Sequence, residues 1–211
     1  SCHYDALHSI LYFEDNILHL SQVYDQPCIL VWFEKPGKID FKVNAERLAA
    51  TKNSLVVQTL DRGREFEFSL HLGTGGGQLV HQPVLDENRS VYARAELSAG
   101  QFIVIAGELS SENISPVASK IAQKPIGEIL AKNEKQIKKA TQYGQLHLKG
   151  RGELEKLIRV NKRAVHTLQD FSGMMRTTSQ YIYYLLWYRD AGVNSTYLSY
   201  AGWPQPAGDN A

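Results

Sequence analysis

The sequence predicts an antiparallel β-sandwich followed by helices, and three observations predict it. Residues 1–110 contain many short segments with the hydrophobic pattern of strands, joined by short turns and by no helical segment. The pattern changes to a helical period near residue 113, and a further helical pattern begins near residue 151. We therefore divide the chain into a β-sandwich (1–112), linker helices (113–150) and the beginning of a second helical domain (151–211).

Two strands are predicted from strict alternation. In KIDFKV, Ile39, Phe41 and Val43 share one face. In EFEFSLHL, apolar residues alternate with polar ones: Phe66, Phe68, Leu70 and Leu72 against Glu65, Glu67, Ser69 and His71. This period is typical of a strand with one buried face and one face exposed to solvent.

Four further strands lie between these two or beside them. CILVWF (28–33) and QFIVIAGEL (101–109) are almost continuously apolar, which is expected for strands buried on both faces. SLVVQTL (54–60) and SVYARAEL (90–97) complete the set. Turn residues separate the strands at KPGK (35–38), DRGR (61–64), GTGGGQ (73–78) and DENR (86–89).

The helical part begins at Ser115, which precedes Pro116 in the manner of a helix start. Pro125 should interrupt this helix, because proline cannot donate the backbone hydrogen bond of a helix interior. A second helix is expected to end near Gly144, with an apolar stripe made of Ile126, Ile129, Leu130, Ile137 and Ala140. Residues 144–152 are predicted to be a linker, and residues 191–201 a short fourth helix. A third helix is predicted at about 152–172, with Leu154 and Leu157 among the residues of its apolar stripe.

Composition excludes several classes of protein. No apolar run approaches the roughly 20 residues of a membrane-spanning helix. Cys2 and Cys28 are too few for a disulfide framework. Residues 1–115 contain 9 Lys/Arg and 15 Asp/Glu and are therefore acidic. Residues 132–163 contain 10 Lys/Arg and 3 Asp/Glu and are therefore basic. Because this segment has a single aromatic residue, Tyr143, and no interleaved set for base stacking, it is interpreted as a solvated helix face, and no nucleic-acid partner is expected.

The sequence shows none of the common catalytic or ligand-binding motifs. GTGGGQ lacks the Lys-Ser/Thr of a phosphate-binding loop and is interpreted as a turn between strands. The seven histidines form no pair at helical i, i+4 spacing and no cluster with Cys or Asp in the sequence, so no metal site and no cofactor are expected. G-x-S-x-G is absent.

The segment YYLLWYRDAG (183–192) is the strongest candidate for a functional site. Its aromatic side chains, among them Trp187 and Tyr188, can stack on the apolar faces of sugar rings. The adjacent Arg189 and Asp190 offer hydrogen-bond donors and acceptors together, as neighbouring sugar hydroxyls require. Alternatively, Arg189 and Asp190 form a buried salt bridge, with Asp190 capping a following helix. The residues alone leave both interpretations open.

This segment resembles a substrate-site motif of the glucoamylase-type glycoside hydrolases, family 15 and its six-hairpin relatives. In that family an aromatic-rich Y-x-W-x-R-D stretch joins the first two helices of an (α/α)6 barrel, and bacterial members place a large antiparallel super-sandwich and linker helices before the barrel. The resemblance implies that residues 151–211 are the start of such a barrel. It also implies that Arg189 and Asp190 bind the non-reducing glucose, with Trp187 and Tyr188 in or beside the pocket wall.

The resemblance implies an inverting exo-acting enzyme that releases glucose from α-linked glucosides. Its two catalytic glutamates come from later helices, so we expect no catalytic residue within this chain, an inactive fragment, and self-association through an exposed truncated helical face. Two alternatives remain. One is a trehalase, an α-1,6-glucosidase or a glycoside phosphorylase on the same barrel, and the other is a non-catalytic carbohydrate-binding or scaffolding module. The compartment stays open between cytoplasm and periplasm.

Overall fold

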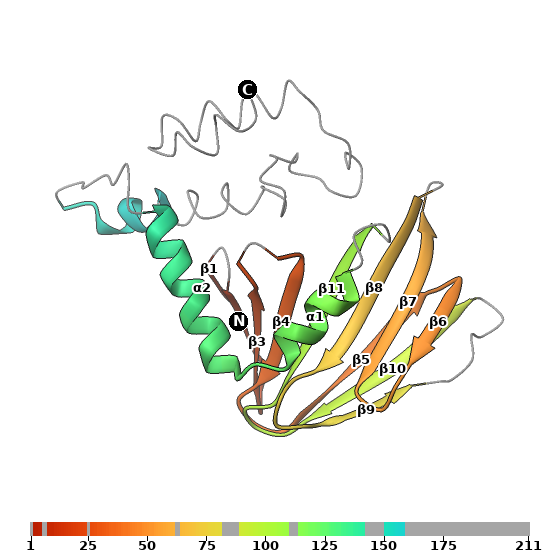
Figure 1. The fold of residues 1–211 in the computed structure, drawn as a ribbon. Helices are drawn as coiled ribbons and strands as arrows, with labels where there is room; N and C mark the ends of the chain where they lie inside the picture. The colour runs from red at the N-terminus through yellow and green to blue at the C-terminus, as the bar shows by residue number, and fades with distance from the viewer. Residues whose placement is uncertain are drawn as a thin grey trace. The chain divides into compact units, whose positions relative to one another are not determined.

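The computed structural model describes residues 2–5, 8–24, 26–61, 64–81, 89–109, 114–141 and 150–158. They form strands, the helices α1 and α2, and a further helical segment at 152–158 (Figure 1). The chain divides into two compact units. The first comprises Ser1–His3, His8–Val23 and Pro27–Ala131, and the second comprises Tyr4–Leu7, Tyr24–Gln26 and Lys132–Ala211.

Two sheets contain the described strands. The larger sheet has eight, in spatial order β1 (Cys2–Asp5), β2 (His8–Tyr12), β3 (Ile17–Gln22), β4 (Cys28–Phe33), β11 (Phe102–Leu109), β8 (Arg64–Leu72), β7 (Ser54–Asp61) and β6 (Arg47–Ala50). The smaller sheet has three, in the order β5 (Gly37–Asn44), β10 (Ser90–Leu97) and β9 (Gln78–His81). The strand pairs β5–β10, β10–β9, β4–β11 and β11–β8 are all antiparallel.

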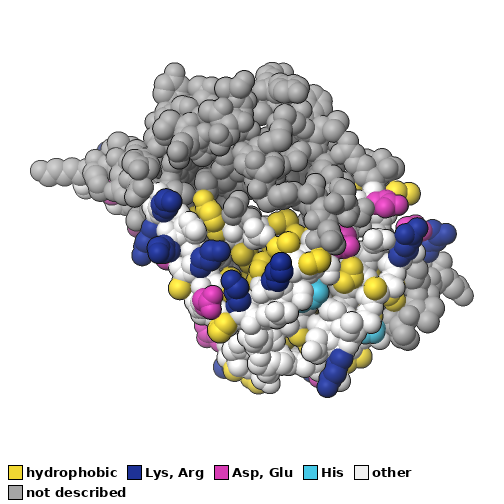
Figure 2. All heavy atoms as spheres, in the orientation of Figure 1, with side chains coloured by type: hydrophobic (Ala, Val, Ile, Leu, Met, Phe, Trp, Pro, Cys, Tyr) yellow, Lys and Arg dark blue, Asp and Glu magenta, His cyan; other side chains and the backbone are white. Residues whose placement is uncertain are grey.

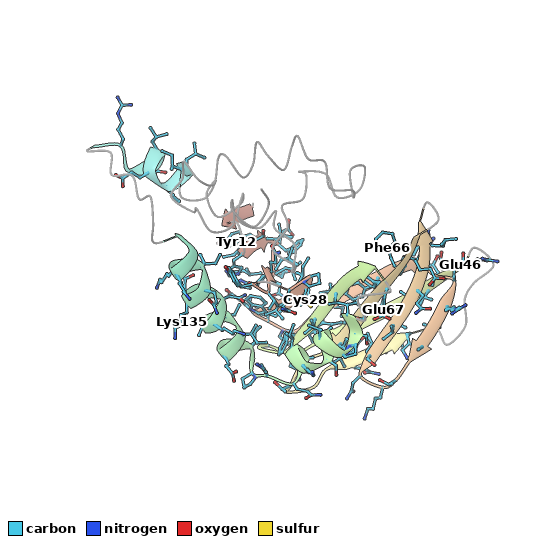
Figure 3. All side chains as sticks on the ribbon, turned by 45° about the horizontal axis from the view of Figure 1, so that its top comes forward. Tyr12, Cys28, Glu46, Phe66, Glu67 and Lys135 are labelled. Carbon is cyan, nitrogen blue, oxygen red and sulfur yellow. The ribbon has the colours of Figure 1, made fainter. Side chains whose placement is uncertain are left out.

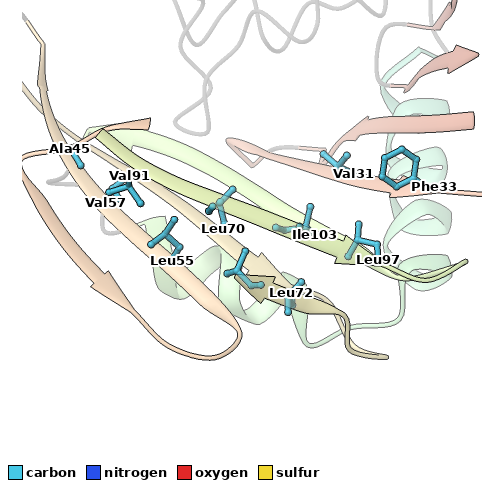
Figure 4. Packing of buried hydrophobic residues seen from close by; sticks show 13 residues of the cluster. Val31, Phe33, Ala45, Leu55, Val57, Leu70, Leu72, Val91, Leu97 and Ile103 are labelled. Carbon is cyan, nitrogen blue, oxygen red and sulfur yellow. The ribbon is translucent and has the colours of Figure 1, made fainter. Parts of the chain in front are cut away.

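A core of apolar side chains lies between the two sheets, and we call it the inner core (Figure 4). The larger sheet contributes Leu55, Val57, Leu70 and Ile103, each fully buried, and the smaller sheet contributes Val91 and Ala95, also fully buried. Burial on this scale is the main stabilising contribution in a domain of this kind. The predicted antiparallel sandwich is confirmed.

Strand β5 follows the predicted alternation at every position. Ile39, Phe41 and Val43 pack against the inner core, while the intervening side chains are exposed. On the exposed side, Arg94 of β10 donates two hydrogen bonds to Asp40, at 2.6 and 3.0 Å. These bonds lower the pKa of the Asp40 carboxyl, and the outer face of the smaller sheet is a paired, solvated surface.

The helices begin and end close to the predicted positions. α1 spans Ile114–Ala122, one residue earlier than the Ser115 start, and Pro116 lies in its first turn. α2 spans Ile126–Thr141, so the predicted interruption at Pro125 is confirmed. Helix α1 packs on β8 and β11, across the larger sheet (Figure 1).

A second cluster, the outer core, lies between the helices and the other face of the larger sheet. Its buried members include Cys28 and Leu30 of β4, Phe102 and Val104 of β11, and Ala118 of α1. Strands β4 and β11 therefore bury both faces, as their continuous apolar sequences predict. Ile29 is an exception, because it remains 43% exposed.

The predicted solvent exposure of one face of β8 is confirmed for Glu65 but is wrong for the other three polar residues. Ser69 is fully buried, and Glu67 and His71 are each only 8% exposed. They lie on the sheet face that α1 covers, opposite to Leu70 and Leu72. The alternation correctly separated the two faces, but a helix from 40 or more residues later in the chain covers the polar one.

The second unit contains the part of α2 that begins at Lys132, together with Tyr24 and its neighbours. Ile137 is buried, and Asn133 is buried with its side-chain oxygen accepting a hydrogen bond from the Tyr24 backbone N–H at 2.9 Å. The lysines of α2 are exposed, as expected for a solvated face: Lys132, Lys135, Lys138 and Lys139. Dark-blue side chains gather over this helix in Figure 2. Among the described helices none is long and apolar enough to cross a membrane.

The helix at 152–158 is the described beginning of the predicted third helix. Leu154 and Leu157, which the sequence assigns to its apolar stripe, are 44% and 55% exposed. The expected helix at 191–201 lies outside the described residues.

Candidate functional site

The sugar-binding residues predicted from the sequence lie outside the described residues. This applies to Trp187, Tyr188, Arg189 and Asp190, and their assignment stays a prediction. Three other features of the described residues could have a chemical role. They are a glycine loop, a polar cluster beneath α1 and a histidine–tryptophan cluster on the larger sheet.

The glycine loop connects β8 of the larger sheet to β9 of the smaller one. Gly75, Gly76 and Gly77 have φ of 102°, 90° and 124°, a backbone region that L-residues rarely adopt. The backbone N–H of Thr74 donates to the Ala122 carbonyl at 2.8 Å, and its hydroxyl donates to the Lys124 carbonyl at 3.1 Å. The loop is thus a turn that satisfies carbonyls at the end of α1, in agreement with the prediction from the sequence.

The polar cluster beneath α1 consists of Glu67, Ser69, His71 and Ser115. The Ser115 backbone N–H donates to Glu67 Oε1 at 2.9 Å, and Ser115 Oγ lies 3.3 Å from His71 Nε2. Figure 3 shows Glu67 on β8 beside α1. A carboxylate is well placed there, because the first N–H groups of a helix lack partners within the helix and carry partial positive charge.

This cluster does not have the geometry of a nucleophile activated by a base. Glu67 is engaged by the helix backbone, whereas a catalytic triad needs a carboxylate that orients the histidine. Burial lowers the pKa of His71, and the nearby Glu67 charge offsets part of this shift. Because the side chains of Glu67 and His71 are almost completely buried, we interpret the cluster as the docking site of α1.

The histidine–tryptophan cluster is formed by His8, His19, Trp32 and Glu34. His8 Nε2 lies 3.0 Å from His19 Nδ1, and His19 Nε2 lies 3.2 Å from Glu34 Oε1. The His19 ring stacks on Trp32 with centroids 4.8 Å apart and planes 7° apart, and His8 lies 5.4 Å from the Trp32 centroid at a tilt of 30°. Two imidazoles and a carboxylate therefore form one hydrogen-bonded row on a rigid aromatic base.

The spacing of the histidines along the sequence does not indicate this row. Helical i, i+4 spacing does not apply to His8 and His19, because they lie on neighbouring antiparallel strands, where His8 pairs with Ser21 and His19 with Ile10. The signal for the pair is the β2–β3 hairpin, and the sequence pattern does not assign those two strands. Within the described residues, no three His, Cys, Asp or Glu side chains form a group that could hold a metal ion.

Cys28 is a free cysteine buried in the outer core. Desolvation raises the pKa of its thiol to about 12. A thiol in this environment is not deprotonated near neutral pH, so Cys28 is a packing residue and no candidate nucleophile.

Several solved structures match part of this chain, whereas the comparisons of sequence give no match. No protein-family model matches the chain, and no curated protein matches it in sequence. One solved structure, titled "Putative kojibiose phosphorylase from human microbiome", is similar over 75% of this chain, with a TM-score of 0.49 and 10% sequence identity. The matched region covers 26% of that protein, so this chain spans about a quarter of its length.

Proposed function

We propose that this chain is the N-terminal portion of an inverting, exo-acting glycoside hydrolase that releases glucose from α-linked glucosides. The observation that carries the proposal is the order of parts in one chain. An antiparallel sandwich comes first, helices α1 and α2 follow, and the aromatic Arg-Asp segment 183–192 comes after them. The glucoamylase-type enzymes that this segment resembles have the same order.

In this proposal, the segment 183–192 forms one wall of a glucose-binding pocket. Arg189 and Asp190 hydrogen-bond the hydroxyls of the terminal glucose, and Trp187 and Tyr188 line or flank the pocket. The substrate is an oligosaccharide or another α-glucoside. Residues 151–211 are the beginning of an (α/α)6 barrel.

The chemistry requires two carboxyl groups that this chain is not expected to supply. An inverting glycosidase uses a general acid and a general base roughly 6.5–9.5 Å apart, which leaves room for the attacking water. We assign both groups to a part of the protein beyond residue 211. Glu153 and Glu155 of the helix at 152–158 are not assigned to catalysis.

The test is hydrolysis of maltooligosaccharides by a protein that continues beyond residue 211, compared with its Arg189→Ala and Arg189→Lys variants. Loss of a buried charge-assisted contact should reduce kcat/KM at least about thirtyfold. Lys keeps the charge without the planar pair of donors and should recover only part of the activity. Arg151→Ala, which removes an exposed arginine, is the matched control and should leave kcat/KM unchanged.

Two readouts separate the alternatives. Proton NMR of the first product should show the β-anomer of glucose, as inversion of an α-linkage requires. Formation of glucose 1-phosphate only in the presence of inorganic phosphate would mean that the enzyme is a phosphorylase and not a hydrolase.

Full activity of Arg189→Ala would contradict the assignment of Arg189 to the glucose-binding pocket. If the protein turns over no glycoside and the 211 residues bind sugar alone, the chain is a binding module.

A further inference from the structure

The histidine–tryptophan cluster has the geometry of a metal-binding histidine pair. In a four-coordinate zinc site with Zn–N bonds of 2.0–2.1 Å, two neighbouring nitrogen ligands lie about 2.9–3.4 Å apart, depending on the angle between the bonds. His8 Nε2 and His19 Nδ1 are separated by 3.0 Å. The two nitrogens face each other in a hydrogen bond, with ring centroids 5.2 Å apart, so each ring must turn toward a common point for both nitrogens to contact one ion.

The contact with Glu34 favours the tautomer of His19 that can bind a metal ion through Nδ1. An ionised carboxylate only accepts hydrogen bonds, so the contact of 3.2 Å places a proton on His19 Nε2. The lone pair of the neutral ring is then on Nδ1, the nitrogen that faces His8. A carboxylate on the far nitrogen of a ligating histidine is the usual partner in metal sites, where it orients the ring and raises its basicity.

The strands and Trp32 hold the pair in place. His8 and His19 lie on β2 and β3, two register positions apart, and the backbone hydrogen bonds of the sheet fix their separation. Trp32 on β4 is directly opposite His19 in the register, and its ring stacks on that imidazole. Little side-chain entropy remains to be lost when an ion binds, which favours binding.

We propose that His8 and His19 bind one divalent transition-metal ion of the Zn²⁺ or Cu²⁺ type through Nε2 of His8 and Nδ1 of His19. Water molecules complete the coordination, and Glu34 orients His19. When the ion binds, it takes the place of the proton between the two rings, and that proton moves to the other nitrogen of His8. This proposal departs from the sequence expectation of no metal and is independent of the proposed glycosidase function.

The test is isothermal titration of the tag-free, EDTA-treated 211-residue protein with ZnCl₂. We expect one saturable site and no heat from MgCl₂, because magnesium prefers oxygen ligands. CuCl₂ should bind more tightly than ZnCl₂, in the order usual for imidazole sites. Bound Cu²⁺ should also quench Trp32, so a Trp32→Phe variant should lose most of the quenching.

Variants decide whether the pair is the site. His8→Ala and His19→Ala should each weaken Zn²⁺ binding more than tenfold. Glu34→Gln alters only an exposed side chain and should weaken it by about tenfold. His81→Ala, on the smaller sheet, is the matched control and should bind as the original chain does. Circular dichroism verifies that each variant is folded.

Either of two results would overturn the proposal. One is the absence of saturable Zn²⁺ binding by the unaltered chain. The other is an affinity that stays the same in folded His8→Ala and His19→Ala, which would place the ion elsewhere.

Discussion

The two faces of the larger sheet differ in what they bury. The face toward the smaller sheet buries only apolar side chains in the inner core, such as Leu55, Leu70 and Ile103. The face toward α1 buries apolar side chains as well, but also Glu67, Ser69 and His71. The inner core is thus held by burial of apolar area alone, whereas α1 is also held by hydrogen bonds to polar side chains of β8.

The largest expected effect compares equivalent leucines on the two faces. Leu70→Ala should destabilise the chain by about 4 kcal/mol, and Leu30→Ala by about 3 kcal/mol, although both side chains are fully buried. Leu70 lies between two sheets that cannot easily close a cavity, whereas Leu30 lies in the outer core, which is covered by helices that can shift more readily. Urea unfolding measures both. A larger loss for Leu30→Ala would reverse this view of the two faces.

The second prediction removes the carboxylate beneath α1. Glu67→Ala should cost about 2 kcal/mol, because the Ser115 N–H loses a charged acceptor in a buried place. Amide hydrogen exchange should increase in α1 more than in the inner-core strands. Glu67→Gln retains an acceptor and should cost less. Glu65→Ala, an exposed neighbour on the same strand, is the control. Equal costs for Glu67→Ala and Glu65→Ala would mean that the carboxylate does not hold the helix.

A stabilising substitution is expected on the same face. Ser69 Oγ is buried and has no hydrogen-bond partner within the described part of the chain. Ser69→Ala removes that polar atom and should increase the free energy of unfolding by up to about 1 kcal/mol. Ser98→Ala, at an exposed position, should have little effect. A clear loss of stability in Ser69→Ala would indicate that the hydroxyl has a partner.

The smallest effect is a pH dependence from His71. Its pKa in the folded chain is below the ordinary value of 6.5, mainly because of burial. Folding therefore favours the neutral ring, and the unfolded chain binds more protons as the pH falls. The contribution of His71 is fully present above pH 6.5 and decreases below it.

The measurement is the free energy of unfolding from pH 7.5 to 5, for the original chain and for His71→Gln. Other groups titrate in this range, so only the difference between the two curves is assigned to His71. The original chain should lose more stability on acidification than the variant. Parallel curves would remove His71 from the pH response.

The sequence by itself determined most of the local structure. Its periodicity predicted β4 and β10 with the bounds that the structure has, and its proline predicted the interruption between α1 and α2. It also separated the two faces of β5 and β8 correctly. These features depend on spacings of two to four residues and on turn chemistry, which one sequence contains. Strands β1, β2, β3, β6 and β9 were not assigned individually, because their patterns are short and mixed.

Only the tertiary structure decided which polar side chains are buried and which histidines meet. The polar face of β8 is buried because α1 docks on it. The Ser115 backbone N–H donates a hydrogen bond to Glu67, which lies 48 residues earlier in the sequence. His8 and His19 meet because β2 and β3 pair in one particular register. Burial and register depend on partners that are distant in the chain, and local periodicity does not contain that information. The role of segment 183–192 in sugar binding is, by contrast, a prediction from the sequence alone.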